Sequence, residues 1–228
     1  MRRRNIALIP AAGVGARFGA GKPKQYVEIN GKTVLQHTIE IFEQHSRIDL
    51  IAVILSPEDS VFQTALSEKV RVFRVGGASR AETVRNGVSA LLEQGLAEAK
   101  DNILVHDAAR CCLPAEALTR LLDEAGENDE GGILAIPVAD TLKRSDGTHH
   151  IDETVARAGL WQAQTPQLFQ TALLQRALSV DDLSEITDEA SAVEKLGIRP
   201  RLVQGDTRNL KLTLPQDEYI VRLLLKAV

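Results

Sequence analysis

Short apolar runs alternate with helical patterns along most of this chain, and this alternation constrains the fold more than any other feature. The runs are IALIP (6–10), LIAVIL (50–55), VRVFRV (70–75), NILV (102–105) and ILAIP (133–137). Continuous apolar strands separated by helices are typical of a mostly parallel sheet covered on both faces. The sequence therefore predicts an α/β fold with a Rossmann-like, mostly parallel twisted sheet and helices on both of its faces.

Capping residues mark several of the expected helices. Three starts stand out: Thr33 with Gln36, Ser79 with Glu82, and Ser56 followed by Pro57. The first two have the spacing of a capping box, and the third places an N-cap before a proline at the first helical position. We expect helices to begin at all three places.

Residues 138–160 interrupt this rhythm. Alternating residues flank a Ser-Asp-Gly-Thr turn at 145–148, which predicts a β-hairpin rather than another strand–helix unit. A hairpin of this length within a compact domain is expected to project and to meet a partner. We therefore predict a single domain over 1–228, with 138–160 as a dimerisation arm.

Composition and charge exclude several classes of protein. The 228 residues are 44% hydrophobic, enough for one sizeable core, and the net charge of −4 argues against nucleic acid as a partner. The apolar runs are too short to span a membrane, and MRRRN lacks the continuation of a leader peptide. Cys111 and Cys112 are adjacent and have no other cysteine to pair with, which indicates a reducing cytoplasm. We give His149 and His150, near the hairpin turn, no metal role.

The loop after the first apolar run is rich in glycine and cations, which is typical of phosphate binding. It lacks the dinucleotide pattern, because Phe18 stands at the third glycine position. It also fails as a P-loop, because Ala16 replaces the first glycine and Pro23 follows the lysine. The loop still offers backbone N–H groups around residues 11–15 and two well-spaced cations, Arg17 and Lys24, for binding phosphate. We expect this loop to meet GGASR (76–80) and HDAAR (106–110), which also follow strands.

Together these segments closely resemble the 2-C-methyl-D-erythritol 4-phosphate cytidylyltransferase family of the nucleotidyltransferase superfamily. The resemblance rests on PAAGVGARF, PKQY, GGASRAETV, VHDAAR, DTLKR, GLWQAQTPQLF, ITDEASAVE and NLKLT, in family order between residues 10 and 213. It implies transfer of CMP from CTP to methylerythritol 4-phosphate, with release of pyrophosphate, in non-mevalonate isoprenoid synthesis. The acceptor phosphate is already ionised, so the absence of a general base from the loop agrees with this chemistry.

Two alternatives stay open at this point. A cytidylyltransferase acting on ribitol 5-phosphate would share most of these motifs. A non-catalytic nucleotide-binding regulator would have no reason to keep transition-state cations together with an acceptor-phosphate pair. The resemblance further implies Mg²⁺ bound mainly through the CTP phosphates, with no metal-ligating residue assigned, and a homodimer in which the arms are exchanged. We expect no fused cyclase domain.

The resemblance also implies roles for individual residues, which fall into three groups. Stabilisation of the transition state is assigned to Arg17 and Lys24. Nucleotide binding is assigned to Ala11, Ala12, Gly13, Gly77, Arg80, Thr83, Ala108 and Arg110. Positioning of the acceptor is assigned to Asp107, Thr141, Arg157, Thr165 and Lys211. Thr187 is expected instead to cap a helix, with Asp188 and Glu189 in its first turn.

Overall fold

A seven-stranded sheet forms the centre of the protein. In the computed structural model, which describes residues 3–13, 23–63 and 67–226, the strand order is β11-β7-β10-β6-β1-β4-β5. Every strand runs in one direction except β10, which pairs antiparallel with both β6 and β7. The strands are β1 (Asn5–Pro10), β4 (Leu50–Ile54), β5 (Val70–Phe73), β6 (Asn102–Val105), β7 (Gly132–Pro137), β10 (Trp161–Gln170) and β11 (Arg201–Gln204). The predicted mostly parallel α/β sheet is confirmed.

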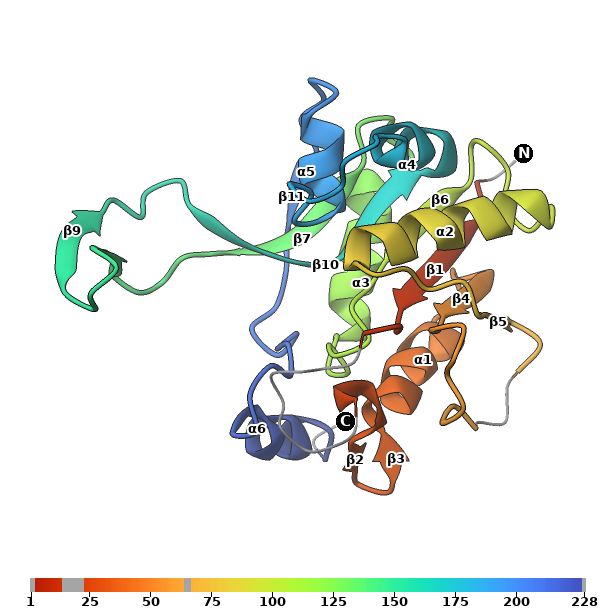
Figure 1. Ribbon diagram of the computed structural model, residues 1–228, viewed down its shortest axis with the longest axis horizontal. Helices are drawn as coiled ribbons and strands as arrows, with labels where there is room; N and C mark the ends of the chain where they lie inside the picture. The colour runs from red at the N-terminus through yellow and green to blue at the C-terminus, as the bar shows by residue number, and fades with distance from the viewer. Residues whose placement is uncertain (1–2, 14–22, 64–66, 227–228) are drawn as a thin grey trace.

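Helices cover both faces of this sheet, as the apolar strands require (Figure 1). Along β1, Ala7 and Ile9 pack into one core, and Ile6 and Leu8 pack into the other. One core contains α1 (Val34–Gln44) and α3 (Ala115–Ala125). The opposite core contains α2 (Arg80–Glu93), α4 (Thr171–Leu178) and α5 (Glu189–Glu194). Burial on both faces explains why the strands are apolar throughout rather than alternating.

The first two predicted helix starts are observed. Thr33 and Gln36 form the complete capping box of α1. At α2, the Ser79 hydroxyl accepts from the N–H of Glu82, but the Glu82 carboxylate turns back to the N–H of Ala78, 2.8 Å away. This second capping box is therefore only half formed.

The helix expected from Ser56 and Pro57 is absent from the described part of that segment, residues 56–63, which is irregular apart from a turn at 57–58. The Asp59 carboxylate accepts from the backbone N–H groups of Val61 and Phe62, at 3.1 and 3.0 Å. An aspartate that bonds its own backbone in this way competes with helix formation. This prediction was wrong because Asp59 was not recognised as a turn residue.

The predicted hairpin is confirmed and projects from the body of the molecule (Figure 1). It pairs β8 (Leu142–Ser145) with β9 (Ile151–Val155), and the ends of β7 and β10 lead into and out of it. A smaller hairpin of β2 (Glu28–Ile29) and β3 (Lys32–Thr33) follows the 3-10 turn η1 (Lys24–Tyr26).

The last helix, α6 (Asp217–Leu224), packs beside the small hairpin. Its Val221 shares a minor core with Ile29 and Leu212. Within the described ranges, the structure contains no helix long and apolar enough to cross a bilayer.

Candidate active site

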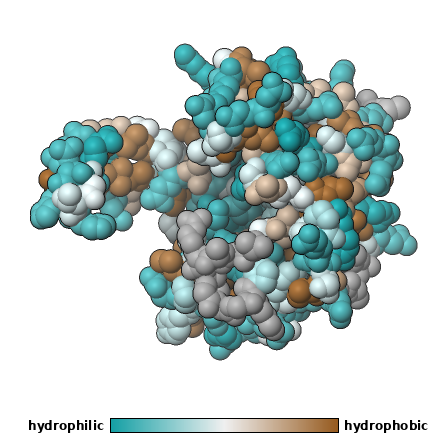
Figure 2. Space-filling view, viewed as in Figure 1, coloured by the Kyte–Doolittle hydropathy of each residue, from teal (hydrophilic) through white to brown (hydrophobic). Residues whose placement is uncertain are grey.

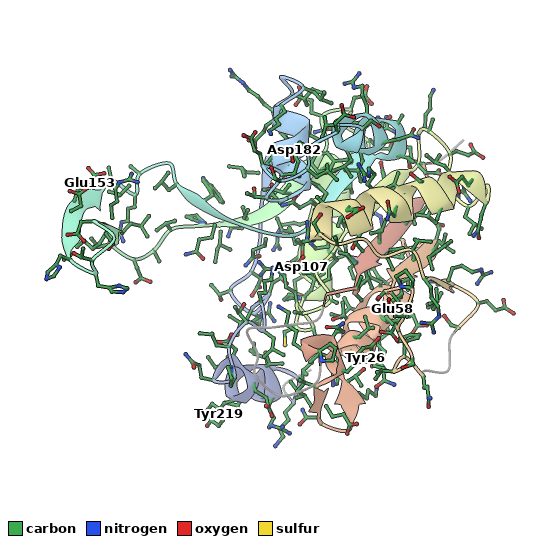
Figure 3. All side chains as sticks on the ribbon, viewed as in Figure 1. Tyr26, Glu58, Asp107, Glu153, Asp182 and Tyr219 are labelled. Carbon is green, nitrogen blue, oxygen red and sulfur yellow. The ribbon has the colours of Figure 1, made fainter. Side chains whose placement is uncertain are left out.

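The loops that follow β1, β5 and β6 meet at one edge of the sheet, as predicted. Between them lies a cavity of about 610 Å³. Figure 2 shows the surface hollowed near the centre of this view, and Asp107 occupies the corresponding place in Figure 3. Ten predicted site residues line the cavity: Ala11, Ala12, Gly13, Lys24, Gly77, Arg80, Thr83, Asp107, Ala108 and Lys211.

The start of the glycine-rich loop is held by the side chain of Gln25. This buried amide donates from Nε2 to the carbonyl oxygens of Ala11, at 3.0 Å, and Gly13, at 2.9 Å. Gln25 lies in η1 directly after Lys24, so the clamp also fixes the turn that carries Lys24. Gln25 belongs to the PKQY motif, but no role was predicted for it from the sequence.

Small residues let the loops after β1 and β5 come close together. A Cβ atom on Gly76 would lie 2.3 Å from Cβ of Ala12 and 2.8 Å from the carbonyl oxygen of Leu55. The backbone of this second loop is tied to α2, because the N–H of Gly77 donates to the Thr83 hydroxyl at 3.1 Å. The loops therefore form a continuous backbone surface along the cavity.

Two lysines enter the cavity from segments far apart in the sequence. Nζ of Lys24 donates to the carbonyl oxygen of Leu212 at 3.3 Å. Nζ of Lys211 lies 2.8 Å from Oδ2 of Asp107. Leu212, which accepts from Lys24, directly follows Lys211 in the chain. Both ammonium groups therefore lie at one wall of the cavity.

Asp107 is the centre of a cluster of charges. Its Oδ1 accepts from Nε of Arg80 at 2.9 Å, and Oδ2 faces Lys211 at 2.8 Å and Nε of Arg110 at 3.8 Å. Burial alone would raise the pKa of this carboxyl, but the attraction of Arg80, Lys211 and Arg110 outweighs it and holds the pKa far below its usual range. Asp107 is therefore ionised at neutral pH.

A chain of hydrogen bonds fixes the backbone beneath this cluster. The N–H of Asp107 donates to the Thr165 hydroxyl at 3.1 Å, and this hydroxyl lies 3.0 Å from Nδ1 of His106. Nε2 of His106 lies 3.0 Å from the carbonyl oxygen of Arg110. Burial lowers the pKa of His106 to about 4, so the ring is neutral and its Nε2–H donates to Arg110. Thr165 and His106 thus set the position of the loop that carries Asp107.

Glu189 was not recognised as part of this site. Both of its carboxylate oxygens bind Arg80, at 2.7 and 3.0 Å, although the residue was expected only to favour a helix N-terminus. The predicted N-cap was also wrong by one residue. Asp188 caps α5 in a capping box with Ser191, where Thr187 was expected, because a carboxylate is the better cap at this spacing. Only the ITDEASAVE motif pointed to this segment, because no local sequence pattern distinguishes a buried glutamate from an exposed one.

Four predicted residues lie outside the cavity lining. Arg110 turns its Nη1 to the carbonyl oxygen of Asn209 at 2.6 Å, and Thr165 lies behind Asp107. Thr141 and Arg157 are exposed on the arm and do not meet Lys211 within one chain. Arg17 falls outside the described residues.

One known protein family matches almost the whole chain. Residues 5–227 match the family described as 2-C-methyl-D-erythritol 4-phosphate cytidylyltransferase. The chain belongs to this family. It is therefore a cytidylyltransferase, an enzyme of the nucleotidyltransferase class.

Individual relatives match over almost their whole length. The cytidylyltransferase of this name from Neisseria meningitidis serogroup A is 70% identical over 231 residues, covering 100% of each chain. That of Chromobacterium violaceum is 50% identical, covering 97% of this chain and 98% of that one. A crystal structure of 4-diphosphocytidyl-2C-methyl-D-erythritol synthase is 64% identical, with a TM-score of 0.89 and coverage of 99% and 100%. The Francisella tularensis cytidylyltransferase structure is 31% identical, with a TM-score of 0.82 and coverage of 97% and 99%.

Proposed function

We propose that this protein transfers the cytidylyl group of CTP to 2-C-methyl-D-erythritol 4-phosphate and releases pyrophosphate. A phosphate oxygen of the acceptor forms a bond to the α-phosphorus of CTP, and the bond from that phosphorus to the bridging oxygen of pyrophosphate breaks. The observation that carries the proposal is the gathering of Lys24, Lys211 and Arg80 with the loop backbone at one cavity. Both substrates are anions, so fixed cations and N–H groups are what the reaction requires.

Roles in this reaction follow from position. The loops are close-packed at Ala12 and Gly76, and with the adjacent Ala11 and Gly77 their backbone suits contact with the flat cytosine ring and the ribose. Lys24, with Arg17 from the same loop, stabilises charge that develops on the α-phosphate. Asp107, held ionised by its three cations, accepts from hydroxyl groups of the bound substrates. Lys211, on the same wall of the cavity, attracts the acceptor phosphate.

Mg²⁺ fits this cavity as a companion of CTP. Asp107 is the carboxylate among the described residues of the lining, and none of the described His, Cys, Asp or Glu side chains form a cluster of metal ligands. Asp107 is already paired with three cations, so the CTP phosphates and water would hold most of the coordination positions of the ion. When bound, the ion would neutralise charge on the triphosphate and on the departing pyrophosphate.

The arm supplies the acceptor-binding residues that the cavity lacks. Thr141 and Arg157 are exposed residues of the arm. The arm projects away from the body of its own chain (Figure 1). Ile151 is 67% exposed near its tip, and Leu160 and Trp161 are also exposed. We infer a homodimer in which these apolar side chains are buried against the partner subunit. In it, each arm brings its Arg157 to the partner's cavity. The free thiols of Cys111 and Cys112 fit a reducing cytoplasm.

Pyrophosphate release in the presence of CTP and Mg²⁺ tests the activity. We expect release with 2-C-methyl-D-erythritol 4-phosphate and little with ribitol 5-phosphate at equal concentration. The Lys24→Ala variant provides the background rate. Absence of release with either acceptor would contradict the proposal, and faster release with ribitol 5-phosphate would favour the alternative acceptor.

A further inference from the structure

Glu189 is a fully buried acid that contacts the cavity only through another residue. Its side chain is 1% exposed, and it does not belong to the cavity lining. Its two oxygens meet Nη1 and Nη2 of Arg80, while Nε of Arg80 meets Asp107. Three of the five N–H groups of the guanidinium are thus committed to two carboxylates. These bonds determine the plane of the guanidinium and the direction of its remaining N–H groups.

The sheet holds Glu189 rigidly in place. Gln167, on β10, is 1% exposed, and its side chain reaches both neighbours of Glu189. Its Nε2 donates to the Asp188 carboxylate at 2.8 Å, and its Oε1 accepts from the N–H of Ala190 at 2.8 Å. The backbone on each side of Glu189 is therefore fixed to the central sheet, and Arg80 is oriented by an acid that cannot easily move.

Stability alone is a weak reason for this arrangement. Burying an ion pair costs desolvation that the attraction between the charges seldom exceeds, and an apolar pair of similar size would serve a core as well. Electrostatic attraction of the substrate does not explain the pair either. A negative carboxylate behind Arg80 reduces the attraction between the cavity and the anionic triphosphate. The remaining consequence of the pair is geometric.

We propose that Glu189 is a positioning residue, which orients the guanidinium of Arg80 toward the bound nucleotide. The inference rests on the proposed function, in which Arg80 contacts CTP. Glu189 itself touches no substrate. Its effect on binding passes entirely through Arg80, and Gln167 supports it from the sheet.

Glu189→Gln tests this inference, with Glu194→Gln as the matched control. Glu194 lies on the same helix and is exposed, so the control makes the same change away from Arg80. We expect the dissociation constant of CTP with Mg²⁺, measured by calorimetry, to rise about tenfold or more in Glu189→Gln. The control should bind as the unchanged protein does. Removing a negative charge should by itself tighten binding, so a weaker complex indicates lost orientation.

A double-mutant cycle separates positioning from general support of the fold. The single ammonium of Arg80→Lys has no planar fork to orient. In that background, we expect Glu189→Gln to change CTP affinity by less than about threefold. A loss as large as in the unchanged background would show that Glu189 acts without Arg80 and would overturn the inference. Thermal unfolding of each variant shows which of them are folded.

Other outcomes are equally decisive. CTP affinity that is unchanged or increased in a folded Glu189→Gln variant would overturn the inference. If this variant unfolds, Glu189→Asp carries the test, because it keeps the charge but withdraws the carboxylate from Arg80. Unchanged CTP affinity in Glu189→Asp would also overturn the inference, and weakened affinity would support it. Pyrophosphate release by the unchanged protein is measured alongside, so that failure of the proposed function is recognised separately.

Discussion

Nζ of Lys211 lies 2.8 Å from Oδ2 of Asp107, so a residue near the end of the chain completes the charge cluster at the exit of β6. We expect Lys211→Met to raise the KM for the acceptor by about tenfold or more, because an anion loses a cationic partner. The CTP dissociation constant should change less. Steady-state kinetics with each substrate varied in turn will show the difference. Lys195→Met, at an exposed site, is the control. Equal loss of affinity for both substrates would instead indicate damage to the cavity as a whole.

Lys24→Ala should slow turnover by about 10²-fold or more, with a smaller effect on CTP binding. The reason is that charge on the α-phosphate grows as the reaction proceeds, so the ammonium matters most in the transition state. Arg17→Ala should behave in the same way. Rapid-quench measurement with saturating substrates gives the rate, and Lys32→Ala on the small hairpin is the control. Near-normal turnover in either variant would remove that residue from the catalytic group.

Gln25→Leu should weaken CTP binding and lower the free energy of unfolding. The leucine keeps the approximate size of the side chain but leaves the carbonyl oxygens of Ala11 and Gly13 without their donor. Loss of such bonds at a buried site costs about 1–3 kcal/mol. Urea unfolding and calorimetry with CTP measure the two effects, and Gln175→Leu on the exposed face of α4 is the control. If both variants bind CTP equally well, the clamp does not shape the nucleotide site.

Burial of His106 predicts a loss of stability in mild acid. Its pKa falls to about 4 in the folded protein, from about 6.5 in the unfolded chain. Between these values the unfolded chain binds more protons, so the free energy of unfolding decreases as the pH falls, by roughly 3 kcal/mol in all. The comparison of wild type with His106→Asn isolates this contribution from that of His45, whose pKa burial also lowers. Urea unfolding from pH 7 to pH 4 provides the measurement.

The slope of the unfolding free energy with pH should be smaller in His106→Asn than in the wild type. An identical slope in wild type and His106→Asn would mean that the ring takes up a proton as readily in the folded protein as in the unfolded chain. That result would contradict the lowered pKa of His106 inferred from its burial.

Mixing two inactive variants tests exchange of the arms. In a mixed dimer of Lys24→Ala and Arg157→Ala chains, one site combines an intact body with an intact arm, and the other site lacks both groups. Random pairing makes about half of the dimers mixed, so about a quarter of all sites in the mixture, and about half of those in the isolated mixed dimer, should recover. Co-refolding of differently tagged chains, followed by isolation of the mixed dimer, allows the measurement. Activity no higher than the mean of the two variants would show that Arg157 serves its own chain.

The sequence by itself determined the sheet, the helix layers and the arm. The pattern of apolar residues was sufficient there, because strands such as β1 are buried on both faces and therefore contain an unbroken apolar run, Ile6 to Ile9. It also placed the loops at 11–13, 77–80 and 107–109 together, because parallel strands end at the same edge of a sheet. The failed helix at Ser56 marks the limit of local signals, since Asp59 bonded its own backbone instead.

Only the tertiary structure decided how the charged groups are paired. Asp107 and Lys211 are separated by most of the C-terminal half of the chain, and no local pattern links them. The same holds for Arg80 and Glu189, which meet because α2 and α5 pack on the same face of the sheet. A carboxylate in the first turn of a helix is ordinarily exposed to solvent. Glu189 is instead buried by the packing of α5, and there it pairs with Arg80. Sequence periodicity specifies which face of an element is buried, whereas packing between elements specifies which polar side chains are buried together.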